Sequence, residues 1–478
     1  MLFVNGCCAS ADHIKTACGR QGSGRIAVAT SRCGFGGGRT QGKLAFHMKK
    51  ADEQIDVAIV GGGLAGVIAL AYARRAGLKA LVMEAQNRIG GLWRDLPAWQ
   101  DIQISAADWA LGDLSLQGVA QPHILANIEA WVDHFGLADG IQLSTPVTLA
   151  REDESGWELS TPHGLVHARH LVAATGAHNT PLLPAISRAA STVREFHSSA
   201  LRDPSALTGC DVLVVGGGAS AFDLLELCFQ HRARRVIWSY RGLRWFMPTR
   251  KPKHIAGSVR GFARMQASGM TLEQQNAAIG SDLRSRYEKF GITEIMPSRD
   301  FDVRHDQVIP GRAGMLENYG SIERHHASVN AIAGATVTLS DETRVEADLL
   351  LWGTGYAVDL SYFASPKIAA IRTLDALGAR CGCIFRSLDA ANLYFPGVGL
   401  DGIGSAPWSY ALMCRSMMSH IQGTARLDNE ALARRLNHFD LVDHLAPRDP
   451  ASFSLDTWRA DYRDLALNTP DDQPYPIP

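Results

Sequence analysis

Two glycine clusters have the residue types and the spacing of a phosphate-binding turn. Gly61-Gly62-Gly63 is followed by Gly66, and Gly216-Gly217-Gly218 is followed by Ala221 at the same distance. These positions form a G-x-G-x-x-G pattern between a strand and a helix, with alanine at the last position in the second copy. The first fixed glycine permits a tight turn, the second lets the backbone approach a pyrophosphate, and the third allows close packing of the helix on the strand. The anion then lies at the helix N-terminus, where free N–H groups and the helix dipole favour it. Each cluster therefore predicts a dinucleotide site.

The residues beyond each turn predict which dinucleotide it takes. Glu84 lies about 20 residues on from the first turn, where a carboxylate binds a ribose diol and repels a 2′-phosphate. The same offset in the second unit reaches Ser239, and Arg241 follows with a guanidinium that can pair with a phosphate. A merely solvated Arg241 is the alternative. We expect FAD at the first turn and NADPH at the second. The candidate contacts in the turns are Gly61, Gly63, Leu64, Ala65 and Gly66, then Gly216, Gly218, Ala219, Ser220 and Ala221.

Strands and helices that could position these turns flank both clusters as an internal repeat. Each copy is a short apolar strand, the glycine turn, an apolar helix and a second strand. The first copy comprises Val57 to Val60, Leu64 to Arg75 and Ala80 to Glu84, and the second comprises Val212 to Val215, Ala219 to Gln230 and Arg235 to Tyr240. Two β-α-β units predict an α/β protein with two Rossmann-like, doubly wound domains.

Composition excludes several other classes of protein. The 478 residues are 46% hydrophobic and 20% charged with a formal net charge of -1, so neither nucleic acid nor a membrane surface is an expected partner. The longest apolar stretch, residues 57–73, is explained by the strand, turn and helix above, so we predict no transmembrane segment. Nine scattered cysteines without a C-x-x-C pair support neither a metal site nor a dithiol centre, and they predict a reducing cytoplasm.

Residues 1–50 differ from the rest of the chain. They are basic, contain Asp12 as their one acid and show no helical or strand period, so they cannot bury enough apolar surface to order themselves. One interpretation is a targeting peptide, although the apolar stretch of a secretory signal is missing. The other, which we favour, is that the true start is Met48. We expect residues 1–50 to be a disordered or mis-assigned extension.

Four further segments carry a family resemblance. Arg88-Ile89-Gly90-Gly91-Leu92-Trp93 contains a Gly-Gly-x-Trp a few residues past Glu84, and three apolar strands follow in order: Leu171 to Gly176, Asp348 to Tyr356 and Asn392 to Gly399. This set resembles the single-component flavin-containing monooxygenases. The resemblance covers about Asp56 to Ile421, which is most of the chain.

The resemblance implies an FAD domain in two segments, with an NADPH domain inserted between them. We expect the FAD domain at 51–180 and 346–430, the NADPH domain at 181–345, and a C-terminal helix and tail at 431–478. Ser405-Ala406-Pro407 also predicts the start of a helix towards Ile421. In this fold that helix would direct its positive end at the flavin pyrimidine ring, unless it is a capped helix without an electrostatic role. The further candidate cofactor contacts are Gly91, Leu92, Trp93, Val147, Thr175, Gly176, Thr354, Gly355, Gly399 and Ser405.

One family fingerprint is degenerate here. The pattern F-x-G-x-x-x-H-x-x-x-(W/Y) retains only its histidine, His197, while Ser191, Val193 and Leu201 occupy the other fixed positions. His197 is our candidate catalytic residue, and a domain-linker residue without chemistry is the alternative. The missing terminal aromatic weakens the Baeyer–Villiger branch more than the N- or S-oxygenating branch.

The activity that the resemblance implies is oxygenation of a small molecule. NADPH would reduce FAD, O2 would form a C4a-hydroperoxyflavin, and a soft nucleophile, an amine or a sulfide, would receive one oxygen atom. The alternatives are a Baeyer–Villiger monooxygenase, an uncoupled NADPH oxidase or reductase, and a non-catalytic nucleotide-binding regulator. The expected partners are the substrate and O2. The sequence does not determine the oligomeric state, for which a homodimer is our expectation.

Overall fold

The computed structural model describes most of the chain beyond the basic N-terminal segment. The described residues are 54–102, 106–109, 114, 116–248, 265, 267–302, 306, 308–382, 385–396, 406–427, 445–447 and 468. The predicted extension at 1–50 and nearly all of the predicted tail at 431–478 lie outside them. Across the described helices, none combines the length and the apolar character needed to span a bilayer.

A mixed sheet of nine described strands holds the first glycine turn. Its order is β20-β21-β22-β6-β1-β2-β3, and β5 and β4 continue antiparallel from β6. The interior strand β1 runs parallel to both β2 and β6, with Val60 opposite Met83 on one side and Ala173 on the other. The strands are β1 (Ile55–Val60), β2 (Ala80–Met83), β3 (Ile141–Gln142), β4 (Leu149–Asp153), β5 (Gly156–Thr161), β6 (Gly164–Ala173), β20 (Cys381–Gly382), β21 (Arg386–Ser387) and β22 (Leu393–Tyr394).

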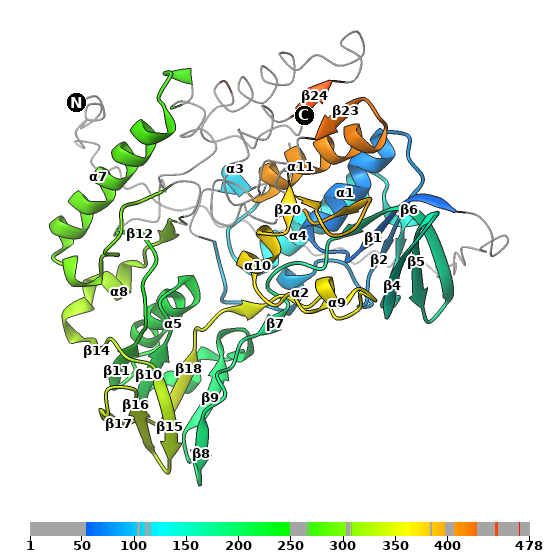
Figure 1. Cartoon of the computed structure of the whole chain (residues 1–478). Helices are drawn as coiled ribbons and strands as arrows, with labels where there is room; N and C mark the ends of the chain where they lie inside the picture. Colours follow the sequence, from blue (N-terminus) through cyan, green and yellow to red (C-terminus); the bar gives the residue numbers. More distant parts are fainter. Residues whose placement is uncertain are drawn as a thin grey trace, which may run out of the picture. The chain divides into compact units, whose positions relative to one another are not determined.

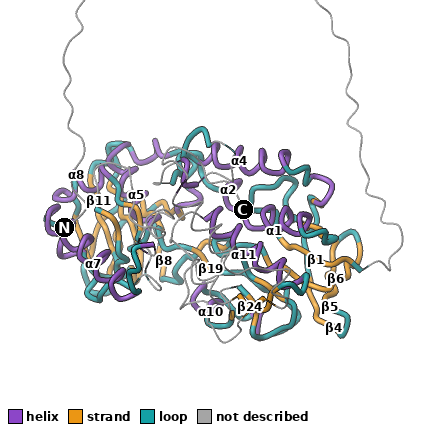
Figure 2. Tube along the Cα trace, turned by 90° about the horizontal axis from the view of Figure 1, so that it is seen from above, coloured by secondary structure: helices purple, strands orange, loops and turns teal. Residues whose placement is uncertain are grey.

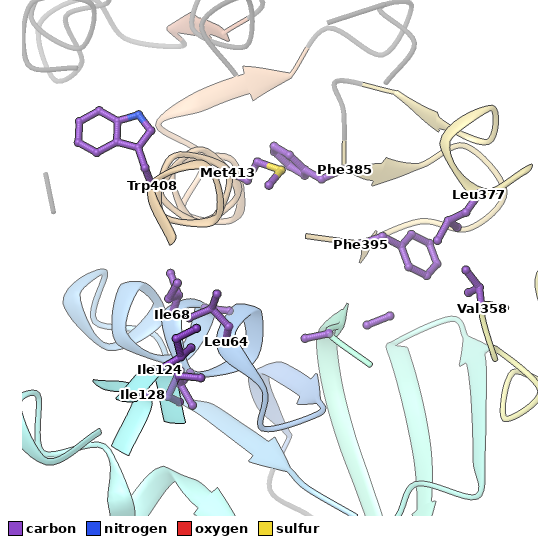
Figure 3. Packing of buried hydrophobic residues seen from close by; sticks show 14 of the residues in the cluster. Leu64, Ile68, Ile124, Ile128, Val358, Leu377, Phe385, Phe395, Trp408 and Met413 are labelled. Carbon is purple, nitrogen blue, oxygen red and sulfur yellow. The ribbon is translucent and has the colours of Figure 1, made fainter. Parts of the chain in front are cut away.

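Helix α1 (Leu64–Arg75) follows β1 and packs between two other helices, α4 (Gln121–His134) and α11 (Ala406–Ile421). Leu64 and Ile68, one turn apart on α1, lie opposite apolar side chains of α4 in Figure 3. Figure 2 shows α1 and α11 together beside β1. This core therefore fixes the direction of α1 and with it the position of the first turn.

The second glycine turn lies in a separate sheet of five parallel strands, in the order β14-β11-β10-β18-β9. Helix α5 (Ala219–Gln230) follows β10 and packs on β10 and β11, as Figure 1 shows in green. This order places β10 at the centre of the sheet, and β10, like β1, has a parallel neighbour on each side. The strands are β9 (Arg194–His197), β10 (Asp211–Val215), β11 (Arg235–Ser239), β14 (Glu323–His325) and β18 (Leu349–Trp352).

The chain passes from the first sheet to the second and back through one short ribbon. Strand β7 (Thr180–Pro181) leaves the first sheet, and β19 (Tyr356–Ala357) returns to it, and the two pair antiparallel. All strands of the five-stranded sheet come from the segment between them. The predicted fold class, two dinucleotide-binding domains with one inserted into the other, is thereby confirmed. The predicted domain boundaries stay predictions.

Smaller elements complete the described part of the chain. Helix α7 (Leu272–Phe290) has a capping box at Thr271 and a left-handed C-cap at Gly291, and it buries Tyr287. The other helices are α2 (Leu92–Asp95), α3 (Ala106–Trp109), α7 (Leu272–Phe290), α8 (Ala313–Glu317), α9 (Pro366–Ala369) and α10 (Leu374–Gly378). The other strands are β8 (Ser187–Ala189), β12 (Phe246–Met247), β13 (Ile309–Pro310), β15 (Val329–Ala333), β16 (Thr336–Leu339), β17 (Arg344–Glu346), β23 (Ala425–Leu427) and β24 (Leu445–Pro447).

Candidate dinucleotide-binding sites

In the first turn, Gly61 and Gly66 have no room for a side chain, whereas Gly63 has. Gly61 has φ +105°, and a Cβ added there would lie 2.6 Å from the carbonyl oxygen of Ala174. A Cβ on Gly66 would lie 1.9 Å from the carbonyl oxygen of Gly61, so no side chain fits. Gly63, at the N-terminal end of α1, has φ -78°, and its Cβ would make only an ordinary contact. The absent side chain of Gly63 therefore leaves space at the helix N-terminus.

The Gly-Gly-x-Trp segment lies directly on this turn. The Gly90 N–H donates to the carbonyl oxygen of Gly62 at 3.0 Å. Gly91 has φ +52°, and a Cβ there would lie 2.8 Å from the Cα of Gly63. Only glycine permits this close approach of two backbones. Trp93 is half-buried, with its ring 5.8 Å from that of Trp109.

Glu84 is buried at the end of β2, where the sequence predicted a carboxylate beside the turn. Its Oε2 accepts from the Gly62 N–H at 2.5 Å, and its Oε1 accepts from the Gln86 N–H at 2.8 Å. Each oxygen can accept a second hydrogen bond. The carboxylate is thus held against the turn with capacity for a further donor. A ribose contact remains a prediction.

A Thr-Gly pair follows the neighbouring strand in each sheet. After β6, the Ala174 N–H donates to the Val60 carbonyl, and after β18 the Gly353 N–H donates to the Val215 carbonyl. The glycines that come next, Gly176 and Gly355, both have φ +79°, with open space where a Cβ would lie. The two sites therefore share the geometry of the turn and also that of the adjacent strand end.

The second turn likewise has two glycines without room for a side chain and one, Gly218, with open space beside it. Gly216 has φ +138°, and its Cβ would lie 2.2 Å from the carbonyl oxygen of Gly353. A Cβ on Gly217 would lie 2.0 Å from the carbonyl oxygen of Gly242. Gly218, at the start of α5, has an ordinary extended backbone, and nothing lies within 4 Å of its Cβ position. This open helix N-terminus has the form that a pyrophosphate requires.

Ser239, the last residue of β11, and Arg241, two residues beyond it, differ in exposure. Ser239 is fully buried, and its hydroxyl donates to the Ala327 carbonyl at 2.6 Å, so its side chain does not reach the turn. Only its carbonyl does, by accepting from the Gly216 N–H at 2.9 Å. Arg241 is exposed, and among the residues that the structure describes its guanidinium has no partner.

His197 is buried at the end of β9 and contacts the start of the segment that returns to the first sheet. Its Nδ1 accepts from the N–H and hydroxyl of Ser199, and its Nε2 donates to the Gly355 carbonyl at 2.9 Å. Burial lowers the pKa of His197, so the imidazole is neutral. The ring of Tyr356 meets it edge-on at 5.0 Å. This geometry favours the linker interpretation, and a catalytic role stays an untested prediction.

A buried charge cluster, which the sequence did not reveal, lies between the segment after α2 and the second site. Arg312 donates from Nε to Asp223 on α5 at 2.7 Å and from a terminal nitrogen to Asp101 at 2.7 Å. The Gln100 amide also donates to Asp223, at 2.6 Å. Burial raises the pKa of Asp223, and Arg312 opposes that rise. A Trp99 hydrogen bond to the Leu201 carbonyl adds a second link at 2.6 Å.

The other residues predicted to contact a cofactor differ in burial and in the contacts that they make. Leu64 is buried, Ala65, Val147 and Ser220 are half-buried, and Ala219 is exposed. Leu92 opens α2, and Thr354 donates to the Leu182 carbonyl. Ala221 is fully buried and packs against Gly353. Gly399 and Ser405 lie outside the described residues, and α11 is described from Ala406.

Comparison with known proteins finds similarity to oxidoreductases, including monooxygenases. Residues 58–278 match the family model described as pyridine nucleotide-disulphide oxidoreductase. A Baeyer–Villiger monooxygenase of Streptomyces coelicolor is 25% identical over 350 residues, 66% of each chain. Flavin-containing monooxygenase 5 of Cavia porcellus is 25% identical over 346 residues, 64% of this chain and 62% of that protein. The matches thus span just under two thirds of both relatives.

Solved structures of monooxygenases share the fold. An open structure of cyclohexanone monooxygenase has a TM-score of 0.59 at 16% identity, over 87% of this chain and 98% of that one. A mutant of a flavin monooxygenase from Stenotrophomonas maltophilia has a TM-score of 0.56 at 17% identity, over 78% of this chain and 99% of that one. The resemblance predicted from the sequence is confirmed: the chain is similar both to a flavin-containing monooxygenase and to a Baeyer–Villiger monooxygenase.

Proposed function

We propose that this protein binds FAD at the first turn and NADPH at the second, and that it is a monooxygenase. It inserts one oxygen atom of O2 into a soft nucleophile, an amine or a sulfide. The observation that carries the proposal is a difference between two otherwise equivalent turns. Both present an open helix N-terminus, but a buried carboxylate, Glu84, lies beside one and an exposed guanidinium, Arg241, follows the other.

The residues present fit both dinucleotides. At the first turn the free space at Gly63 and the N-terminal N–H groups of α1 would hold the FAD pyrophosphate, with Glu84 on the ribose. At the second turn Gly218 and α5 would hold the NADPH pyrophosphate, with Arg241 on the 2′-phosphate. A protein of similar fold has been crystallised in complex with FAD and NADP; it is 16% identical to this chain, with a TM-score of 0.58.

Bound FAD would supply the redox chemistry, and the protein would supply placement. The cluster of Asp101, Arg312 and Asp223 ties the segment after α2 to helix α5, which carries the second turn. His197 holds Gly355 at the return from the inserted sheet. The first of these contacts links the segment after the Gly-Gly-x-Trp motif to the helix of the second turn. Hydride transfer between two bound dinucleotides requires that the parts of the chain that hold them keep a fixed spacing.

A Baeyer–Villiger reaction is the second candidate. It is favoured by the Streptomyces relative, whereas the degenerate fingerprint around His197 favours the soft nucleophile. The two differ in product, because a ketone would give an ester and an amine or sulfide would give an N-oxide or sulfoxide.

The test uses full-length protein loaded with FAD. Anaerobic NADPH should bleach the flavin faster than NADH does. After oxygen is admitted, product and hydrogen peroxide should be counted per NADPH for an amine, a sulfide and a ketone. Coupled formation of an N-oxide or sulfoxide supports the leading proposal, and an ester supports the second. Peroxide alone with every substrate contradicts both and indicates an oxidase, while an unbleached flavin refutes the NADPH site.

A further inference from the structure

A histidine just after the edge strand β14 holds the turn that carries Arg241. Strand β14 runs parallel to β11, so both end at the same edge of the sheet, where ligands bind in such folds. The Tyr240 N–H donates to the His325 carbonyl at 3.0 Å, which continues the ladder by one residue. Beyond it, His326 Nε2 donates to the carbonyl oxygen of Arg241 at 2.6 Å.

The rings of His326 and Tyr240 strengthen this attachment. They are stacked, with centroids 5.4 Å apart and planes 24° from parallel. Tyr240 is itself anchored against buried Trp238, at 4.5 Å between ring centroids. His326 therefore has two contacts to the Arg241 turn, one polar and one aromatic, although its own ring is exposed.

The turn is held from the other side by the second glycine turn. A Cβ on Gly217 would lie 2.0 Å from the Gly242 carbonyl oxygen, so the two backbones are in close contact there. Arg241 thus lies between a contact to the pyrophosphate turn and a contact to His326. Its backbone is fixed while its guanidinium is exposed at the edge of the sheet.

We propose that His326 is a positioning residue for coenzyme specificity. By holding the carbonyl of Arg241, it directs the guanidinium to the 2′-phosphate of an adenosine bound at the second turn. This rests on the proposed NADPH site. An adenosine without a 2′-phosphate gains nothing from the arrangement, so His326 contributes to the preference for NADPH over NADH and not to nucleotide binding in general.

The experiment is a double-mutant cycle with His326→Ala, Arg241→Ala and the double variant. The probes are 2′,5′-ADP and 5′-AMP, which differ only in the 2′-phosphate, and binding is measured by calorimetry on FAD-loaded protein. An arginine–phosphate contact is worth about 1.5–3 kcal/mol, so Arg241→Ala should weaken 2′,5′-ADP roughly 10- to 100-fold. His326→Ala should weaken it on the order of fivefold, the double variant should match Arg241→Ala, and 5′-AMP should be unaffected. His163→Ala, at an exposed hairpin, is the matched control.

Three results would overturn the inference. Equal losses for both probes would make His326 a general structural residue. Additive losses would mean that its ring meets the phosphate independently of Arg241. Unchanged 2′,5′-ADP affinity would leave it no role. Because these probes need no flavin reduction, failure of NADPH to bleach the flavin would refute the proposed function separately.

Discussion

Replacing Gly218 by alanine should separate the role of the second turn in binding from its role in folding. Its backbone, at φ -115° and ψ -172°, is extended, and nothing lies within 4 Å of the added Cβ. Folding should therefore be unharmed, and the less flexible unfolded chain should add up to about 1 kcal/mol of stability. The methyl group occupies the space that a pyrophosphate would need. Loss of one charge-assisted hydrogen bond, about 1.5–3 kcal/mol, should weaken NADPH roughly 10- to 100-fold.

The assay is anaerobic flavin reduction against NADPH concentration, with the melting temperature and the FAD content measured alongside. Gly216→Ala is the matched control, because there φ is +138° and the Cβ would lie 2.2 Å from the Gly353 carbonyl oxygen. It should lose at least about 1–3 kcal/mol through backbone strain alone and should melt earlier. The reasoning would be refuted if Gly218→Ala bound NADPH normally, or if it melted as early as Gly216→Ala.

Two further predictions concern ionisable side chains that are buried or partly buried. Arg312→Met should lower the free energy of unfolding, measured in urea, by about 3–5 kcal/mol, because Asp223 and Asp101 lose their cation. Adding Asp223→Leu should recover part of that loss. A loss under about 1 kcal/mol would contradict the buried ion pair of Arg312 and Asp223. Burial first, and then the charge of Arg169, lowers the pKa of His170 to about 4 from 6.5, so the folded state holds it neutral. Wild-type stability should therefore fall as pH drops from 6.5 towards 4, and the fall should be shallower in His170→Gln; equal slopes would show that His170 does not cause it.

The parts of the fold that depend on neighbouring residues in the chain were predictable. Helices α1 and α5 begin and end where the sequence placed them, because the glycine turn fixes the start and the loss of apolar periodicity fixes the end. The free position at Gly63 and the buried carboxylate of Glu84 also follow from spacing alone.

The parts that depend on distant segments were not. Asp101, Asp223 and Arg312 are far apart in the sequence, and no local pattern indicates that they meet. Counting residues along the second unit predicted Ser239 as a contact. Its side chain is buried by residues that are distant in the sequence, and a residue spacing carries no information about them. The two roles considered for His197 likewise depended on Gly355, whose carbonyl only the fold brings to the ring.

The ribbon formed by β7 and β19 has an evolutionary consequence. Because the chain enters and leaves the inserted sheet at adjacent points, the whole module occupies what would otherwise be one loop of the first domain. A single insertion of genetic material at that loop could therefore have added the second nucleotide site without disturbing the first core. The same turn, helix and Thr-Gly strand end recur in both domains, so the inserted segment is best explained as a duplicated copy of the first domain.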